Sequence, residues 1–93
     1  MKIKMKNLTS SKTNSGDVVF FLFATISKEI NGNIVSLNND YVFEFYNDSD
    51  LYNIDLNDFD DYNNCIKPKL LEKLMQNKKE IDQLFEQQLN NGQ

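Results

Sequence analysis

Residues 17–46 read DVVFFLFATISKEINGNIVSLNNDYVFEFY, and this stretch decides the fold. Its first part, residues 17–30, is rich in Val, Phe, Thr and Ile, which is typical of a long β-strand. Asn31-Gly32 comes next, and this pair favours a two-residue type I′ turn between antiparallel strands. The chain then returns through residues 33–38, so the sequence predicts a β-hairpin around Asn31-Gly32.

Polar clusters farther along predict that the sheet continues beyond this hairpin. Asn39-Asp40 is a second candidate for a tight turn, and residues 41–46 then alternate and are rich in aromatic residues. Residues 47–50 predict a third turn, after which residues 51–57 alternate again. The expected architecture is therefore an antiparallel meander of four strands.

With these three turns, the side chains of the meander over residues 17–57 divide between two faces of the sheet. The expected core face carries Val19, Phe21, Phe23, Thr25, Ile34, Tyr41, Phe43, Phe45, Tyr52, Ile54 and Leu56. The second face carries Val18, Phe20, Leu22, Ala24, Ile26, Val35, Leu37, Val42, Glu44, Tyr46, Asn53, Asp55 and Asn57. This second face is apolar on its first two strands, so either another segment of the chain or a partner should cover Phe20 and Leu22.

The N-terminal segment predicts a further strand at an edge of the sheet. Lysines alternate with apolar residues over residues 1–8, as in an edge strand whose lysines point outward and discourage further pairing. Residues 9–16 are polar and predict a loop. The sheet would then contain five strands, of which the first is short.

Residues 68–91 predict one long amphipathic helix that packs on one face of the sheet. Pro68 suits the first helical position, and Gly92 suits the residue after the end. Apolar residues recur at helical spacing: Leu70, Leu71, Leu74, Met75, Ile81, Leu84, Phe85 and Leu89. A helix of this length measures roughly 35 Å. The expected fold class is therefore α+β.

The composition excludes several classes of function. The chain has no His, no Arg and no Trp, and its single cysteine is Cys65. Without His, neither a Ser-His-Asp nor a Cys-His arrangement can form within the chain. One Cys supplies neither a structural zinc site nor an internal disulfide, and the three glycines form no phosphate-binding pattern. We therefore expect a non-enzymatic protein that uses no cofactor and no metal.

The sequence also bears on where the protein works. The longest apolar run, residues 18–24, is far shorter than the roughly 20 residues that span a bilayer. The lysines near the N-terminus are not followed by the apolar stretch of a secretory signal. We expect one domain over residues 1–93 that stays in the cytoplasm and does not bind a membrane.

Negative charge is concentrated in the middle of the chain. The net charge is −4, yet residues 38–64 carry eight acidic residues and no basic one. The acids expected to contact a partner are Asp48, Asp50, Asp55, Asp58, Asp60 and Asp61. They do not form an EF-hand calcium loop, because no Gly stands at the sixth position after Asp48, Asp50 or Asp55. A carboxylate pair for glycoside hydrolysis would need an apolar pocket, which nothing in the sequence marks.

Two interpretations of this acidic segment stay open. In the first, it is a solvated rim in which Asp55 or Asp58 caps a short helical turn that carries Phe59 and Tyr62. In the second, its spaced carboxylates imitate the phosphates of a nucleic acid and dock on a site of a partner that is lined by Lys and Arg. Direct binding to nucleic acid is not expected, because the chain is acidic and lacks Arg.

These observations favour a small acidic protein that binds other proteins. Its sharper form is a phage or mobile-element inhibitor, of the anti-CRISPR or anti-restriction type, whose acidic surface blocks a nucleic-acid-binding site on a host enzyme. The abundance of Asn and the use of Lys alone as basic residue indicate AT-rich coding, as in low-GC bacteria and their phages. The alternative is a structural or assembly subunit, such as a homodimer, that self-associates through apolar residues of the second face: Phe20, Leu22, Val42 and Tyr46.

Overall fold

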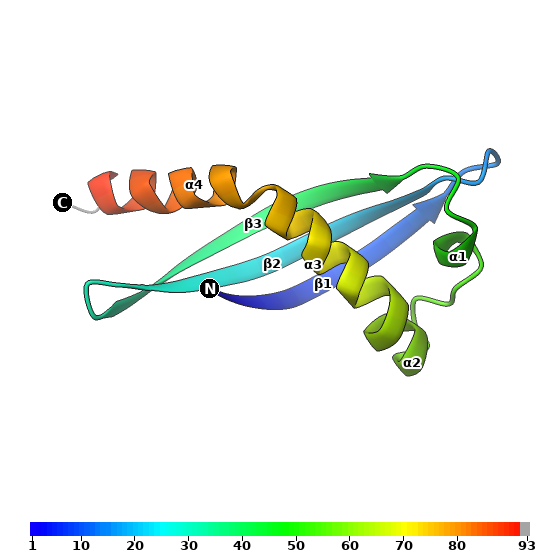
Figure 1. The fold of residues 1–93 in the computed structure, drawn as a ribbon, viewed down its shortest axis with the longest axis horizontal. Helices are drawn as coiled ribbons and strands as arrows, with labels where there is room; N and C mark the ends of the chain where they lie inside the picture. The colour runs from blue at the N-terminus through cyan, green and yellow to red at the C-terminus, as the bar shows by residue number, and fades with distance from the viewer. Residues whose placement is uncertain (92–93) are drawn as a thin grey trace.

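Three antiparallel strands and a series of helices make up the fold in a computed structural model, which describes residues 1–91 (Figure 1). The strands are β1 (Lys2–Lys12), β2 (Val18–Ile30) and β3 (Asn33–Phe45), and their order in the sheet is β1-β2-β3. The helices are α1 (Ser49–Tyr52), α2 (Phe59–Asp61), the π-helix η1 (Tyr62–Ile66), α3 (Lys67–Gln76) and α4 (Lys78–Asn91). The predicted α+β class is confirmed, but the sheet has three strands in place of the predicted four or five.

The hairpin around Asn31-Gly32 forms as predicted. Asn31 has a φ of 53° and Gly32 a φ of 83°, which is the pair of positive values that a type I′ turn requires. Ile30 consequently pairs with Asn33 across the turn, and the pairing of β2 with β3 starts there.

The predicted second turn at Asn39-Asp40 is wrong. β3 continues straight through both residues, and Asn39 pairs with Ala24 of β2. A turn there would have ended the strand halfway, whereas the continuous strand gives every residue of β2 from Val18 to Ile30 a partner in β3. Buried backbone N–H and C=O groups must be hydrogen-bonded. A neighbouring strand as long as β2 provides partners for these groups along the whole of β2.

The continuous β3 brings together residues that were predicted to lie on opposite faces of the sheet. Without a turn, Phe43 pairs with Phe20 and Tyr41 pairs with Leu22, so these residues share one face. The helices cover this face, and Phe20 is only 2 % exposed. Of the predicted core face, Tyr41, Phe43 and Phe45 do lie in the core, whereas Phe21 and Phe23 lie on the side that no helix within residues 1–91 covers.

Strand β1 is longer than predicted. The strand expected over residues 1–8 extends to Lys12, so part of the expected loop over residues 9–16 pairs with β2. A bulge between Met5 and Asn7 shifts the register. The connection to β2 is therefore short, and it is closed by a hydrogen bond of 3.0 Å from the Thr13 amide to the Asp17 carbonyl.

Residues 51–57 do not form the predicted fourth strand. α1 begins instead at Ser49, because the carboxylate of Asp48 caps its N-terminus and accepts a hydrogen bond of 3.1 Å from the Leu51 amide. Leu51 is buried in the core, while the following segment runs as a loop to α2. The predicted cap at Asp58 is confirmed, since its carboxylate accepts from the Asp61 amide at 2.9 Å.

The predicted single helix over residues 68–91 is two helices, with a break at Asn77. The amide of Asn77 donates to the Leu74 carbonyl at 3.0 Å, which ends α3 with a tighter turn. Figure 1 shows α4 leaving in a different direction from α3, which crosses the strands obliquely. Pro68 lies in the first turn of α3, but it does not begin a helix as predicted, because α2, η1 and α3 follow one another without a break from Phe59. The predicted stop at Gly92 lies outside the described residues.

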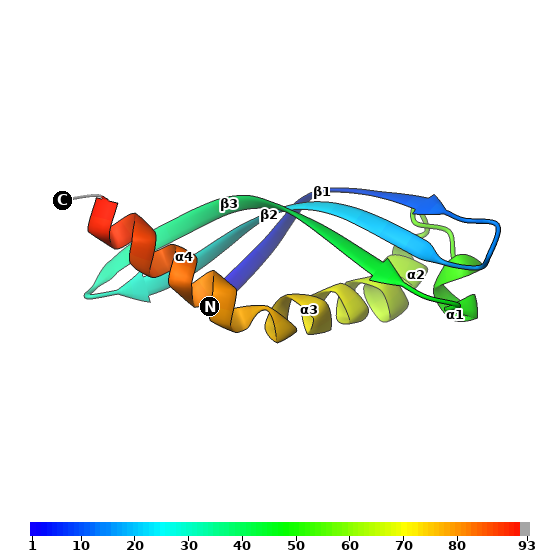
Figure 2. The same cartoon turned by 90° about the horizontal axis from the view of Figure 1, so that it is seen from above.

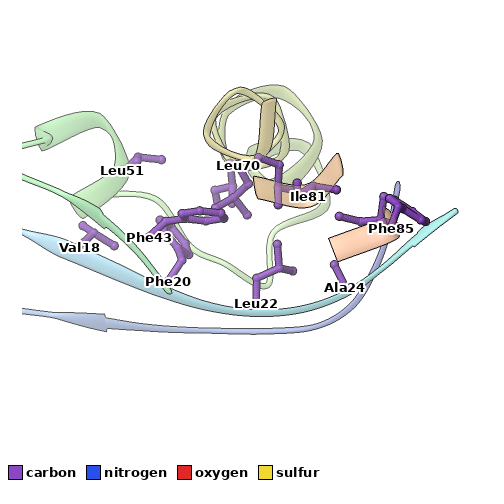
Figure 3. Packing of buried hydrophobic residues seen from close by; sticks show 12 residues of the cluster. Val18, Phe20, Leu22, Ala24, Phe43, Leu51, Leu70, Ile81 and Phe85 are labelled. Atoms are coloured by element: carbon purple, nitrogen blue, oxygen red, sulfur yellow. The ribbon is translucent and has the colours of Figure 1, made fainter. Parts of the chain in front are cut away.

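The core lies between the sheet and the helices. Figure 3 shows Phe20, Leu22 and Ala24 of β2 on the side where Leu70 of α3 and Phe85 of α4 pack. The buried set combines a period of two on β2 with helical spacing on α3 and α4: Val18, Phe20, Leu22, Ala24, Ile26, Phe43, Leu51, Ile66, Leu70, Leu74, Ile81 and Phe85. The opposite face of the sheet therefore stays open to solvent.

Candidate interaction surfaces

The structure presents two surfaces on which a partner could dock. We call residues 48–61, which comprise α1, α2 and the loop between them, the acidic end; Figure 1 shows α1 and α2 at the same end of the molecule. We call the uncovered side of the sheet the open face. It is formed by Val19, Phe21, Phe23 and Thr25 of β2, Thr9, Asn7, Lys4 and Lys2 of β1, and Glu44, Val42, Asp40 and Asn38 of β3.

Asp48 is tied into the fold of the acidic end. Its carboxylate accepts a hydrogen bond of 2.7 Å from the Nζ of Lys69 in α3, in addition to the capping bond from the Leu51 amide. The bond from Lys69 holds the pKa of Asp48 below its usual range, although partial desolvation opposes this shift. Asp48 thus links α1 to α3, and its carboxylate is poorly placed to contact a partner protein as well.

Two further acids stabilise local turns. Asp58 caps α2, and the carboxylate of Asp55 accepts from the Asn57 amide at 2.9 Å. Both side chains stay exposed, and an ionised carboxylate can accept more than one hydrogen bond. The interpretation of the segment as a solvated rim with capping roles therefore describes Asp48, Asp55 and Asp58.

Two acids of the segment line one hollow. Asp50 of α1 and Asp61 of α2 border a depression of about 620 Å³, which we call the acidic hollow; its other lining residues are Ser49, Asn53, Ile54, Asn64, Cys65, Pro68 and Lys69. Polar oxygens and apolar carbon thus occur side by side in it. Asn53, Asn64 and Cys65 were not among the predicted site residues, and only their place next to the acids could have suggested them.

The acids do not form a metal site in the part of the chain that the structure describes. No group of three or more His, Cys, Asp or Glu side chains within residues 1–91 lies close enough together to hold a metal ion. Asp60 lies on α2 with its side chain exposed, while Asp50 and Asp61 meet only at the acidic hollow. The arrangement suits contacts with separate cationic groups better than the coordination of one ion.

The predicted apolar site is divided between the two sides of the sheet. Phe20 and Leu22 are buried beneath the helices, so the prediction that they contact a partner is wrong. Val42 is 57 % exposed on the open face, and Tyr46 donates a hydrogen bond from its hydroxyl to the Glu44 carboxylate of that face. This bond to a negatively charged acceptor raises the pKa of Tyr46.

The open face carries aromatic residues that the sequence had assigned to the core. Phe21 and Phe23 are 47 % and 38 % exposed in the middle of the central strand. Phe21 pairs with Val42, and a shallow hollow of about 220 Å³ lies between these residues and Asn7, Thr9 and Asp40. The signal that could have found this surface is the run of residues 18–24, which is apolar on both faces of the strand.

None of the helices within residues 1–91 has the length and apolar character that crossing a membrane requires. Comparison of the chain with protein-family models, with curated proteins and with solved structures gives no match. Its function has to be inferred from the acidic end and the open face.

Proposed function

We propose that this is a small acidic, non-enzymatic protein that docks its acidic end on a basic site of a partner protein. The observation that carries the proposal is the acidic hollow, where the carboxylates of Asp50 and Asp61 border the apolar side chains of Ile54 and Pro68. A Lys or Arg side chain has an apolar stem and a cationic head. The hollow offers a suitable environment for both parts.

The charge balance of the acidic end supports this proposal. Lys69 is the one basic residue that lines the acidic hollow, and its Nζ already contacts the Asp48 carboxylate at 2.7 Å. Among the described residues, no ion pair involves Asp50, Asp60 or Asp61. These three carboxylates are therefore available to cations of a partner.

In its sharper form, the proposal names a nucleic-acid-binding enzyme as the partner. A channel lined by Lys and Arg recognises phosphates, and carboxylates spaced along α1 and α2 present a similar series of negative charges. We propose a cytoplasmic inhibitor from a phage or mobile element, of the anti-CRISPR or anti-restriction class, that occupies such a channel. The small size of the chain and its lack of His and Arg fit a protein that blocks a site without catalysing a reaction.

The test removes the free carboxylates and spares the structural ones. The variant Asp50→Asn/Asp60→Asn/Asp61→Asn leaves the caps at Asp48 and Asp58 in place. Wild type and variant are immobilised, a lysate of a low-GC bacterium is passed over both, and retained proteins are identified by mass spectrometry. We expect wild type to retain a nucleic-acid-binding enzyme and the variant to lose it, with circular dichroism showing an unchanged fold.

A second variant controls for the loss of three charges. Glu72→Gln/Glu80→Gln/Glu86→Gln removes the same charge from exposed positions of α3 and α4, and it should retain the enzyme. The proposal fails if no nucleic-acid-binding enzyme is retained by wild type. It also fails if the Asp→Asn variant binds as tightly as wild type at low salt, where exposed charges act most strongly.

A further inference from the structure

The open face is uncovered in the described part of the chain although its centre is apolar. Figure 2 shows α1, α2 and α3 on one side of the arched sheet. α4 belongs to the same side, because its Ile81 and Phe85 join the core with Ala24. Phe21 and Phe23 thus remain half exposed in the middle of the sheet, where burial of their apolar surface against a partner is favourable.

The two edges of the open face carry opposite charges. Lys2 and Lys4 project from β1, opposite Ser27 and Thr25 of the central strand. Asp40 and Glu44 project from β3, on the other side of the aromatic centre. The apolar centre is therefore flanked by a basic edge and an acidic edge.

We propose that a second copy of this chain covers the open face, with the two sheets stacked about a two-fold axis parallel to the strands. Such an axis places β1 of each copy over β3 of the other, so the basic edge meets the acidic edge twice. An axis across the strands would instead place β1 over β1 and β3 over β3, so the basic edge would not meet the acidic edge. Phe21 and Phe23 of the two copies meet along the axis, as in a β-sandwich.

The geometry of stacked sheets brings the charges within reach of each other. Lys4 pairs with Thr25 and Asp40 pairs with Phe23, which lies two residues away on β2. Lys4 and the second copy's Asp40 are therefore displaced by about 7 Å along the strand direction. The ordinary rotation of about 30° between stacked sheets and the length of a lysine side chain can close this gap. The shallow hollow beside Phe21 can seat a side chain of the opposite copy.

The open face spans about the area that a small specific dimer interface requires. Three strands of up to 13 residues at a spacing of about 4.8 Å and a rise of about 3.4 Å per residue give a surface of about 600 Å² per copy. Two such surfaces bury at most about 1,200 Å², because the open face lies on the outer side of the arched sheet, and this value is the lower bound for specific interfaces. The acidic ends lie in the outward-facing helix layers of this dimer, so the proposed dimer leaves them free for a basic partner.

Sedimentation equilibrium between about 1 µM and about 1 mM protein measures the proposed dimer directly. We expect wild type to reach twice the chain mass of 10.9 kDa. Phe21→Asp should raise the dissociation constant at least about 30-fold, since it places a charge at the centre of the interface. Met75→Asp is the matched control, because Met75 is 48 % exposed on α3 and should leave the dimer intact.

A charge-reversal pair tests the orientation of the axis. Lys4→Glu alone should weaken the dimer, because it places two acids together, and Lys4→Glu combined with Asp40→Lys should restore it. The inference is overturned if wild type stays a monomer at about 1 mM or if Phe21→Asp dimerises as well as wild type. Failure of the double variant to restore the dimer overturns the axis. Retention of a partner by the acidic end is measured separately, so either proposal can fail alone.

Discussion

Asp48 combines a helix cap with an ion pair, and single substitutions separate the two contributions. Asp48→Asn keeps an oxygen that can cap α1 through the Leu51 amide but loses the charge that attracts Lys69. Asp48→Ala loses both contacts. We expect Asp48→Ala to lower the free energy of unfolding by about 1–2 kcal/mol, and Asp48→Asn to lower it by less than about 1 kcal/mol because the ion pair is partly exposed.

The contribution of the Asp48 charge depends on pH in a definite direction. Its pKa is lowered in the folded protein, so the stabilisation is fully present above the pKa of an unfolded aspartate, about 3.9. It is lost as the pH falls through the lower folded pKa. Urea unfolding should therefore show a gap between wild type and Asp48→Asn at pH 7 that closes in acid. Asp60→Asn serves as control and should show little change; a gap that persists in strong acid would contradict the expectation.

At the scale of single elements, β2 divides its side chains between a buried and an open face. Phe20 is buried against the helices, whereas its neighbour Phe21 faces solvent. Phe20→Ala should lower the free energy of unfolding by about 3–5 kcal/mol, through lost burial and a cavity. Phe21→Ala should cost less than about 1 kcal/mol in dilute protein, where self-association contributes little. Chemical denaturation measures both values, and equal losses would show that the faces are assigned incorrectly.

The elements that the sequence predicted correctly depend on local signals. The Asn31-Gly32 turn needs only two residues that tolerate positive φ, and the cap at Asp58 needs only a carboxylate before a helical turn. The faces of the sheet could not be assigned in this way. Residues 18–24 are apolar on both sides of the strand, so alternation does not tell which side is buried. The turn wrongly placed at Asn39-Asp40 then grouped Tyr41 and Phe43 with Phe21, although they pair with Leu22 and Phe20 on the other face.

Other features depend on contacts between distant elements. The break at Asn77 lets α3 and α4 both pack on a sheet that arches, as Figure 2 shows. The helical spacing of apolar residues in the sequence does not indicate the curvature of the sheet. For the candidate site, the six acids were visible in the sequence. The acidic hollow was not, because it forms where α1 and α2 meet the start of α3.

At the scale of the whole molecule, the sheet order β1-β2-β3 follows the order of the chain. Each strand pairs with its neighbour in sequence across a short connection, and β-hairpins form in about 1–10 µs. The contacts that join segments far apart in sequence come from the helical half of the chain, which packs on the sheet through Leu51, Ile66, α3 and α4. Chains dominated by local contacts fold fast, so we expect folding to begin in the strands and end with the helices.

This order of events makes a kinetic prediction about the two layers of the core. Ile26→Val changes a buried residue of β2 and should mainly slow folding, whereas Phe85→Leu changes a buried residue of α4 and should mainly speed unfolding. Stopped-flow measurements in urea give both rates, and a folding rate slowed as much by Phe85→Leu as by Ile26→Val would contradict the expectation. If folding ends with the docking of α4, unfolding begins with its detachment. The packing of α4 on the sheet then sets the unfolding rate, and the hairpin of β2 and β3 sets the folding rate.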